Sequence, residues 1–600
     1  MGLENSIQYA QLFIASHSTL AYTILIILAT SLSLFLLYRA ALPKPLPGIP
    51  YHAASAHNIF GDVPAMLSHI ANEDGTFISY LVQSLEKLDA PLVQVFIKPF
   101  SKPLLILSDY VEAHDMMVHR TKEFDRSTSS GDLVRGLGPD HHIHLKTTPK
   151  WRSQRRLVQD LMTPSFLNKV AGPALYQKVC ELLDLWRAKS KIANGKPWVA
   201  AEDIDNVSLD AVMAFAFGER FGQTHSATRP AIEAIQALSE ADTTSLVESG
   251  SQNDPVIFPK GKTNELLRAT LELVETVQEV QGSPLPDLKW AYVNSKPQVR
   301  RATKIKEGYI TSELKDALGR LRGTEEEFVK SAVDHMVFRE KVLAEKDGRS
   351  PNYFSRVMMD EIFGFVIAGN DTSSTAISWG LKYLAENQVA QRKLRRALET
   401  AFPQAASEGS TPGIQDITGT HIPYLDATVE ETLRCAASVP VVDRQAVVDT
   451  ELLGYRVPKG TVVTCLVTGP SMTSPAFSIG KGRRSAGLSG NGKQRHRNWD
   501  PQGMASFEPE RWLVGGGGEF DAGAGPQLAF GLGTRQCFGK RLAHLEMRII
   551  IALIVWTFEL LPCPSALSGH KPVLIMTNRP KDCYVRLREV QRNMKMQITI

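Results

Sequence analysis

The sequence predicts a mainly α-helical protein with small β-sheets (an α+β arrangement), built as one large domain on an N-terminal transmembrane helix. Three observations lead to this prediction. Apolar residues recur at intervals of three and four between about residues 151 and 402, which is the period of helices with one buried face. Strand-like runs are few and short. An uncharged apolar run stands near the N-terminus.

The apolar run covers residues 19–38 and is long enough to cross a bilayer as a helix. Arg39 and Lys44 follow it, whereas Glu4 is the only charged residue before it, and positive charge marks the cytosolic side. A cleaved signal peptide is the alternative, disfavoured by the length of the run and the lack of a basic start. We expect the chain to divide into a short luminal N-terminus at 1–18, a transmembrane helix at 19–38, a proline-rich hinge at 39–50 and a cytosolic domain at 51–600.

Composition and charge exclude several classes of protein. The 600 residues are 43% hydrophobic and 22% charged, with a formal net charge of +4. No basic stripe or RNA-binding motif is recognisable, so nucleic acid is not an expected partner. Six scattered cysteines fit neither a disulfide framework nor a zinc site. The basic, glycine-rich residues 478–498 are expected to be a surface insertion, with a docking patch for an acidic partner as the alternative.

Two β-hairpins are expected outside the helical region. Residues 92–100 and 103–109 form the first, and residues 451–467 form the second, with its turn at Pro458-Lys459-Gly460. We therefore expect small sheets at the edge of a helical body.

The stretch FGLGTRQCFGKRLA places Cys537 just before an apolar helix. Unpaired N–H groups and the helix dipole stabilise a thiolate at a helix N-terminus. Gly531 and Gly533 allow a tight turn, Gly539 allows close approach of a flat group, and Arg535 supplies a cation. A thiolate in such a pocket suits an iron centre, although the same residues also describe a catalytic cysteine.

The spacing Phe530-x-x-Gly533-x-Arg535-x-Cys537-x-Gly539 resembles in full the haem-binding signature of the cytochrome P-450 superfamily. The resemblance implies the P-450 fold and haem b as the cofactor, with Cys537 as the axial ligand of the iron. Thiolate ligation pushes electron density toward iron and favours O–O cleavage. The resemblance further implies that Phe530 packs beside the ligand and that Arg535 pairs with a haem propionate.

A pair of charged residues precedes this loop by about 100 residues. Glu431 and Arg434 lie at i and i+3, on one helical face, a spacing that many proteins show by chance. Their position before FEPERW, which contains Arg511, resembles the order of motifs in the family. The resemblance implies a structural Glu431–Arg434–Arg511 network around the cysteine loop.

The segment FGFVIAGNDTSSTAISWGL is an apolar helix interrupted by small and polar residues. A glycine in a helix interior costs about 1 kcal/mol, and a buried unpaired aspartate costs more. A kinked core helix is the alternative explanation. Beside the haem signature, the segment resembles the family's oxygen-binding helix. This implies a groove for dioxygen at Ala368 and Gly369, and proton delivery through Asp371 and Thr372.

Upstream basic residues complete the resemblance. Trp151 and Arg155 share one helical face, and the family uses both to hold a haem propionate, although a plain basic amphipathic helix also explains them. Arg444 lies where the family often has another propionate-binding arginine. The neighbouring histidines suggest a metal site, but a solvated loop ahead of a helix is the simpler interpretation for His141, His142 and His144.

The resemblance implies a haem-thiolate monooxygenase of the endoplasmic reticulum membrane, using O2 to hydroxylate or epoxidise a lipophilic small molecule. No flavin or nicotinamide domain is recognisable, and 63 residues (600 − 537) follow Cys537, so electrons are expected from NADPH through a separate NADPH-dependent cytochrome P-450 reductase. The chain resembles fungal microsomal members that tailor secondary metabolites, and the apolar residues 436–442 fit a hydrophobic, polycyclic substrate.

Two alternative functions remain open at this point. One is a reductase-independent relative that isomerises a substrate or rearranges a peroxide. The other is a haem-binding membrane protein without catalysis. The acid–alcohol pair Asp371-Thr372 argues against both, because neither needs delivered protons.

Overall fold

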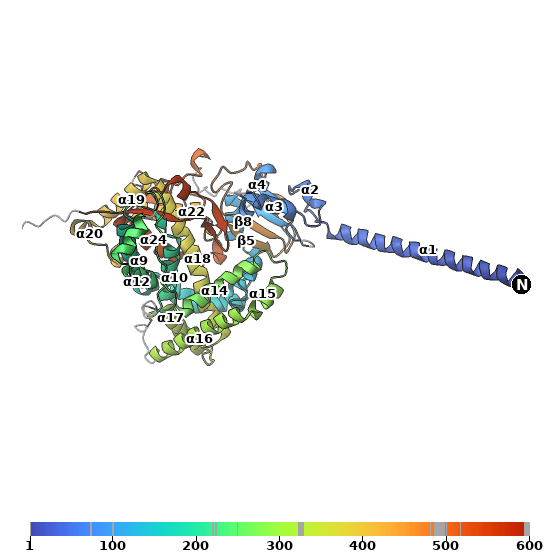
Figure 1. Cartoon of the computed structure of the whole chain (residues 1–600), viewed down its shortest axis with the longest axis horizontal. Coiled ribbons are helices and arrows are strands. Elements are labelled where there is room, and N and C mark those ends of the chain that lie inside the picture. The colour runs from blue at the N-terminus through green and yellow to red at the C-terminus, as the bar shows by residue number, and fades with distance from the viewer. Residues whose placement is uncertain are drawn as a thin grey trace, which may run out of the picture.

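A helix-rich body carries one long N-terminal helix that extends away from it (Figure 1). The computed structural model describes residues 2–72, 75–98, 101–218, 221, 225–248, 250–321, 329–480, 482–484, 499, 501–516 and 518–592. Most of the expected insertion at 478–498 lies outside these residues.

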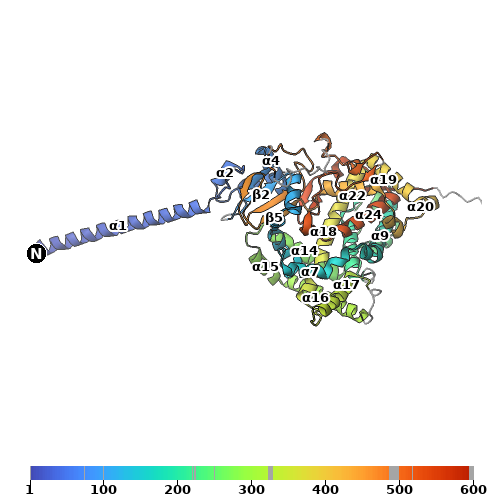
Figure 2. The same cartoon turned by 180° about the vertical axis from the view of Figure 1, so that it is seen from behind.

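The N-terminal helix α1 (Gly2–Ala41) contains the expected apolar span. Its part Ala21–Ala41 has a mean hydropathy of 2.1 and no share of it is buried, so length and composition suffice to cross a membrane. A signal sequence would pass the same test. The helix already begins at Gly2, so the segment expected to be a separate N-terminus continues the same helix (Figure 2).

The proline-rich hinge is held against the body by one side chain. Gln94 is fully buried, and its amide nitrogen donates to the carbonyls of Leu46 (2.9 Å) and Ile49 (2.8 Å). Its oxygen accepts from the Leu46 N–H at 2.8 Å. The chain therefore leaves α1 along a fixed path rather than a loose tether.

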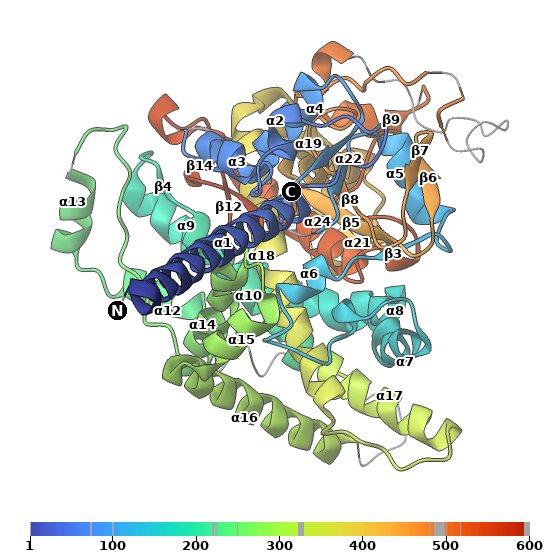
Figure 3. The same ribbon diagram turned by 90° about the vertical axis from the view of Figure 1, so that its right-hand side faces the viewer.

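The body is built around α18 (Arg356–Glu386), whose residues are buried on most sides (Figure 3). Helices α10, α22 and α24 pack against it, as expected of a helix that is buried on most sides. The other helices are, in chain order, α2 (Ala53–Ala56), α3 (Val63–Ile70), α4 (Phe77–Lys87), α5 (Tyr110–Val118), α6 (Ser129–Asp132), α7 (Pro149–Val158), α8 (Pro164–Phe166), α9 (Gly172–Ala193), α10 (Ala201–Phe217), α12 (Arg229–Gln236), α13 (Glu240–Glu248), α14 (Glu265–Val280), α15 (Pro286–Ser295), α16 (Pro297–Arg320), α17 (Ala332–Lys346), α19 (Gln388–Ala401), α20 (Pro403–Glu408), α21 (Ile414–Gly419), α22 (Pro423–Ala436) and α24 (Lys540–Thr557).

The strands form one five-stranded sheet and several small ones. The large sheet has the order β1-β2-β8-β5-β3, and a three-stranded sheet has the order β11-β14-β4. The remaining pairs are β6-β7, β9-β10 and β12-β13. The strands are β1 (Leu92–Val95), β2 (Leu104–Leu107), β3 (Phe124–Arg126), β4 (Trp198–Val199), β5 (Val441–Ala446), β6 (Thr450–Leu452), β7 (Tyr455–Val457), β8 (Val462–Leu466), β9 (Leu513–Val514), β10 (Glu519–Phe520), β11 (Phe558–Leu561), β12 (Pro572–Leu574), β13 (Asn578–Pro580) and β14 (Tyr584–Glu589).

The first predicted hairpin is present, whereas the prediction of the second is wrong. Strands β1 and β2 pair antiparallel as expected. In the second region the tight hairpin is β6-β7, which turns at Leu453 (φ 49°) and Gly454 (φ 73°), two positive values that suit a two-residue hairpin turn. Strand β8, after Gly460, leaves this hairpin and pairs with β2 and β5 in the large sheet.

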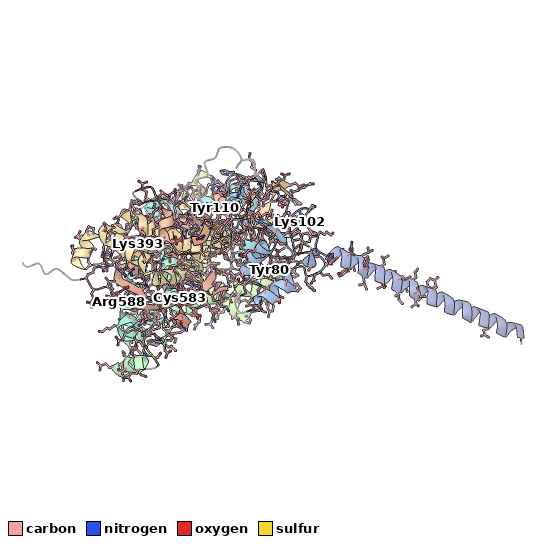
Figure 4. The ribbon with its side chains drawn as sticks, turned by 90° about the horizontal axis from the view of Figure 1, so that it is seen from above. Tyr80, Lys102, Tyr110, Lys393, Cys583 and Arg588 are labelled. Carbon is pink, nitrogen blue, oxygen red and sulfur yellow. The ribbon has the colours of Figure 1, made fainter. Side chains whose placement is uncertain are left out.

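The core lies mainly between the helices. The largest apolar cluster joins residues of α9, α10, α18, α22 and α24, and smaller clusters cover the five-stranded sheet. Figure 4 places Tyr80 and Lys102 at the end of the body next to α1, and Lys393 and Arg588 toward the opposite end. The mainly helical architecture with small sheets is confirmed.

Candidate active site

The cysteine loop is a tight turn that ends at the N-terminus of α24. The Cys537 N–H donates to the Phe530 carbonyl at 2.8 Å. Gly531 and Gly533 have φ values of 59° and 71°, in the left-handed region that favours glycine. A Cβ on Gly533 would lie 2.1 Å from the Met117 carbonyl oxygen. The backbone therefore requires the glycines that the sequence places here.

The thiol of Cys537 is accessible to solvent although protein atoms surround it, so it forms part of an interior wall. Burial is the largest influence on it and raises its pKa. Backbone N–H groups of Gly539 and Lys540, together with the Arg126 and Arg155 guanidinium groups, oppose that rise. These donors favour the thiolate, and a coordinated cation would complete its stabilisation.

Space is kept free beside the thiol. A Cβ on Gly539 would meet only the Cys537 Sγ, at 4.0 Å. The aromatic rings of Phe530 and His544 lie with centroids 5.1 Å apart on one flank of the loop. Gly539 is thus not required by packing among the described residues, and its lack of a side chain leaves the surface of the thiol open.

Four arginines from distant segments gather near this thiol. Arg126 in β3 is the register partner of Arg444 in β5. Arg535 belongs to the cysteine loop, where its Cζ lies 4.4 Å from the centre of the Trp151 ring. Arg155 of α7 places its Cζ 4.2 Å from the centre of the ring of Phe538, the residue after Cys537. No ion pair joins any of the four to a carboxylate in the part of the chain that the structure describes.

The gathered arginines repel one another. The pKa of Arg535 is lowered to about 10, first by burial and then by Arg126, Arg444 and Arg155, while Asp125 opposes the shift. Burial also lowers the pKa of Arg126, with Arg444 as the next cause. Like charges paired across a sheet are destabilising unless an anion lies between them. The arrangement therefore calls for an anionic ligand.

Buried donors without partners also indicate an anionic ligand. The Nε of Arg126 and the Nε1 of Trp151 are buried and have no hydrogen-bond acceptor among the described residues. Arg535 donates to the Leu145 carbonyl at 2.8 Å, and Arg444 donates to the Leu532 carbonyl at 3.2 Å. A flat group with two carboxylates and a metal that accepts a thiolate satisfies both sets of residues. The residues present fit haem.

The oxygen-helix motif has two differently exposed faces. Ala368 is accessible to solvent and Thr372 partly so, although both lie in the middle of a buried helix. The Thr372 hydroxyl donates to the Ala368 carbonyl at 2.7 Å, a back-bond that weakens the helix locally. A Cβ on Gly369 would lie 2.6 Å from a methyl group of Val212, so Gly369 also lets α10 approach α18.

Asp371 is held by an arginine from the C-terminal hairpin. Arg579 in β13 donates through Nε to the Asp371 Oδ1 at 2.7 Å, and its Nη2 lies close to the same oxygen. The same guanidinium group donates to both Asp205 carboxylate oxygens, at 2.9 and 3.0 Å. The second oxygen of Asp371, Oδ2, is buried without a partner among the described residues. One arginine therefore bridges the acid of α18 and an acid of α10.

The Glu431–Arg434 pair is fully buried and bidentate, at 2.8 and 2.7 Å. Arg434 also donates to three backbone carbonyls ahead of the cysteine loop, those of Met472 (3.0 Å), Met504 (2.9 Å) and Ser506 (3.1 Å). The expected third member, Arg511, approaches Glu431 only to 3.7 Å. The Trp512 indole N–H donates to Glu431 at 2.9 Å instead. The network joins the helix to the segment that leads to Cys537.

The histidines before α7 are not solvated, so that interpretation is wrong. His142 contacts Glu361 of α18 with both its Nδ1 (2.7 Å) and its backbone N–H (2.8 Å). His141 Nε2 lies 3.4 Å from the same carboxylate, and a Cβ on Gly364 would collide with its ring. Burial lowers the pKa of His141 to about 3 and that of His142 well below its usual value. The two histidines hold the loop to α18 through Glu361, and the ligand atoms of the three residues lie within 4.8 Å of one another, as the alternative of a metal site requires.

Several residues of this site carry no sequence signal. Arg126 lies in a short strand and meets Arg444 only because β3 pairs with β5. Arg579, Asp205 and Glu361 belong to no recognisable motif, and only the fold brings each to its partner. Trp512 stands inside the FEPERW motif, and its indole N–H was the one available hint of a polar role.

A family model described as "Cytochrome P450" matches residues 63–475 and 504–582. The chain is 39% identical to cytochrome P450 monooxygenase TRI13 of Fusarium sporotrichioides, covering 93% of this chain and 98% of that protein. It is 33% identical to cytochrome P450 monooxygenase GME11363 of Pestalotiopsis microspora, covering 96% and 100%. It is also 35% identical to cytochrome P450 monooxygenase xilC of Penicillium rubens, covering 93% and 94%.

Solved structures share the fold at low sequence identity. The haem domain of cytochrome P450DA matches with a TM-score of 0.64 and 16% identity, over 92% of this chain and 99% of that one. A cytochrome P450 named CYP102L1 matches with a TM-score of 0.64 and 18% identity, over 91% and 100%. These two likenesses support the fold of the chain.

Proposed function

Because the chain belongs to the cytochrome P450 family and is a haem-dependent oxidoreductase, we propose that it inserts one oxygen atom of O2 into a lipophilic small molecule by hydroxylation or epoxidation. We further propose that Cys537 is the axial ligand of the haem iron. The observation that carries the proposal is the solvent-accessible Cys537 near Arg126 and Arg155, which cluster with Arg444 and Arg535 and, like them, form no ion pair with a carboxylate among the described residues.

The chain's own residues would hold haem at two places, at the iron and at the propionates. Cys537 would ligate the iron, while Arg126, Arg155, Arg444 and Arg535 would hold the propionates, because these cations otherwise repel one another. The indole N–H of Trp151 would supply one more donor. Thiolate-ligated haem supplies the activation of dioxygen, because the sulfur pushes electron density toward the iron.

Protons are proposed to arrive through two side chains of α18, Asp371 and Thr372. Thr372 and Ala368 form the accessible face of the helix, and Asp371 lies one residue before the threonine. The buried Oδ2 of Asp371 has no partner among the described residues, so it is available to bind and pass on a proton. Asp205, about one-third exposed, and Arg579 connect Asp371 toward solvent.

Electrons are proposed to come from NADPH through a separate reductase at the endoplasmic reticulum membrane. Support comes from exposed cations on α7, the helix that carries Arg155: Lys150, Arg152 and Arg156. An acidic partner would be steered to the side of the body that holds Cys537. Arg484 belongs to the expected basic insertion, but it donates hydrogen bonds to Asp109 at 2.6 and 2.9 Å. Its charge is therefore already paired within the chain.

The substrate is proposed to be a fungal secondary metabolite. Relatives of 33–39% identity are fungal monooxygenases that this chain matches over nearly its whole length. Within the expected specificity segment 436–442, Ala436 and Ala437 are buried and Val439 is 38% exposed. A small apolar wall of this kind fits a bulky hydrophobic molecule.

Reconstitution with purified reductase and NADPH tests the proposal. The expected result is NADPH oxidation that depends on substrate, with one oxygen atom from labelled O2 in the product. Product without NADPH would indicate an isomerase or a peroxide-rearranging enzyme. Substrate binding without NADPH oxidation or product would indicate a haem-binding protein without catalysis. Either of these outcomes contradicts the proposal.

Replacing Arg579 with glutamine is expected to lower the product formed per NADPH consumed by about tenfold, since a charged hydrogen bond to a buried carboxylate is lost. Arg579→Lys should recover part of the loss. Arg588→Gln removes an exposed arginine whose one ion pair among the described residues is with Glu559, and it should leave the coupling unchanged. Peroxide release and product are measured together. Unchanged coupling in Arg579→Gln would show that the bridge has no part in proton delivery.

A further inference from the structure

A basic groove is lined by residues of α14, α15 and α16. These three helices lie on the same side of the body (Figure 3). Its volume is about 1020 Å³, at the upper limit of the usual size of ligand pockets. Leu137, Leu273 and Met359 give it apolar walls. Met359 belongs to the first turns of α18, nine residues or two and a half turns before Ala368, so the groove meets the helix that carries the candidate oxygen site on its opposite face.

The charges in the groove are strongly unbalanced. Its lining contains one carboxylate, Glu307, and that carboxylate pairs with Arg356 at 2.5 Å. Within the described residues, no ion pair joins the other cations of the lining to a carboxylate. Those cations are Arg300, Lys304, Lys306 and Lys315, all on α16.

Lys306 is a second, independent sign of a ligand. It is only 5% exposed, and among the described residues its Nζ donates to the Leu137 carbonyl at 3.4 Å and lies 4.6 Å from the centroid of the Phe363 ring, with the Glu307 and Asp360 carboxylates acting on it without forming an ion pair. Buried lysines are rare unless an anion pairs with them. Burial lowers the pKa of Lys306. An ammonium group that lines a groove in this state has donors to spare for an anion.

We propose that this groove binds the carboxylate of a lipophilic acid substrate, with Lys306 as its partner and the apolar walls in contact with the rest of the molecule. The inference rests on the proposed function and names the substrate class. Phe363, beneath the Lys306 ammonium, stands five residues before Ala368, or about 7.5 Å along the helix axis. Five residues are also more than one turn, so Phe363 and Ala368 lie on different faces of α18, and the acid would have to pass around the helix to reach Ala368.

Binding of dodecanoic acid and of its methyl ester tests the proposal. Both are titrated by calorimetry into the full-length haem-loaded protein in a non-ionic detergent at low salt. The acid is expected to bind at least about tenfold more tightly than the ester, because only the acid forms a charge-assisted hydrogen bond. Lys306→Met should lower the affinity for the acid to that for the ester and leave the affinity for the ester unchanged.

Two further variants separate this effect from misfolding. Gly308 lines the groove, and a Cβ there would meet no atom within 4 Å, so Gly308→Trp should fill the groove, weaken binding of both ligands and keep the fold. Lys346→Met removes an exposed lysine of α17 outside the lining and should change neither affinity. Lys306→Met is expected to raise the melting temperature, because it replaces a buried cation that has no carboxylate partner among the described residues.

Equal affinities of acid and ester in the wild type would overturn the proposal, as would an acid-to-ester ratio that survives Lys306→Met. Flotation with vesicles containing phosphatidylserine tests whether the groove binds the anionic headgroup of a lipid instead. If Lys306→Met weakens that binding but not the acid preference, the groove is a lipid site and the substrate proposal is wrong. The proposed function is tested separately, because the reduced carbon monoxide spectrum does not depend on Lys306.

Discussion

Replacing Asp371 with asparagine is expected to lower product formation about 10²–10⁴-fold, the usual contribution of a positioned proton donor or acceptor. The side chain keeps its size, so substrate binding and the haem spectrum should match the wild type. Its amide cannot carry a proton to Thr372, and it no longer forms a charged pair with Arg579. NADPH oxidation, peroxide release and product are measured in one reaction with reductase.

A second buried acid near α18 supplies the matched control. Glu546 of α24 accepts a hydrogen bond from Ser373 at 2.6 Å, and burial raises its pKa to about 7. Glu546→Gln should leave coupling near the wild-type level, because Ser373 is buried and does not lie on the accessible face with Thr372 and Ala368. If Asp371→Asn keeps full coupling, Asp371 does not deliver the protons. If Glu546→Gln loses coupling instead, the protons are delivered through Glu546 and Ser373.

Replacing Arg434 with methionine is expected to destabilise the protein by about 3–5 kcal/mol, because it leaves a buried charge uncompensated. Glu431 and Arg434 are both fully buried, and the change also leaves three backbone carbonyls without their donor. These carbonyls precede the cysteine loop, so haem retention should fall with stability. Urea unfolding and haem content after gel filtration give the two readouts.

A double variant and a surface variant complete this experiment. Glu431→Leu combined with Arg434→Met should be less destabilising than the sum of the single changes, because neither charge is left alone. Arg301→Met breaks the exposed pair with Glu265 and should cost less than about 1 kcal/mol. An Arg434→Met protein as stable as the wild type would show that the buried network does not hold the loop in place.

Local spacing predicted the parts of the site that lie within one segment. The glycines of the cysteine loop are required by their own positive φ values, and Glu431 and Arg434 meet because helical residues three apart share a face. Such information is present in a few consecutive residues. The apolar period of the helices is local too, and it predicted a mainly helical body.

Contacts between distant segments were beyond local patterns. Arg126 and Arg579 stand in short strands, and their roles depend on which strand or helix each of them meets. The second hairpin was assigned to the wrong turn because Pro458-Lys459-Gly460 looks like a turn, whereas Leu453 and Gly454 make the tighter one. The expected solvation of the histidines failed for the same reason, since Glu361 arrives from α18.

The reduced-plus-carbon-monoxide difference spectrum tests the central claim most directly. The wild-type protein is expected to show the Soret shift that is typical of thiolate-ligated haem, because Cys537 is accessible beside the arginine cluster. Cys537→Ala should lose that shift while keeping a folded body, because the loop glycines remain. A wild-type protein without the thiolate shift, or a Cys537→Ala protein that keeps it, would contradict the assignment of Cys537 as the iron ligand.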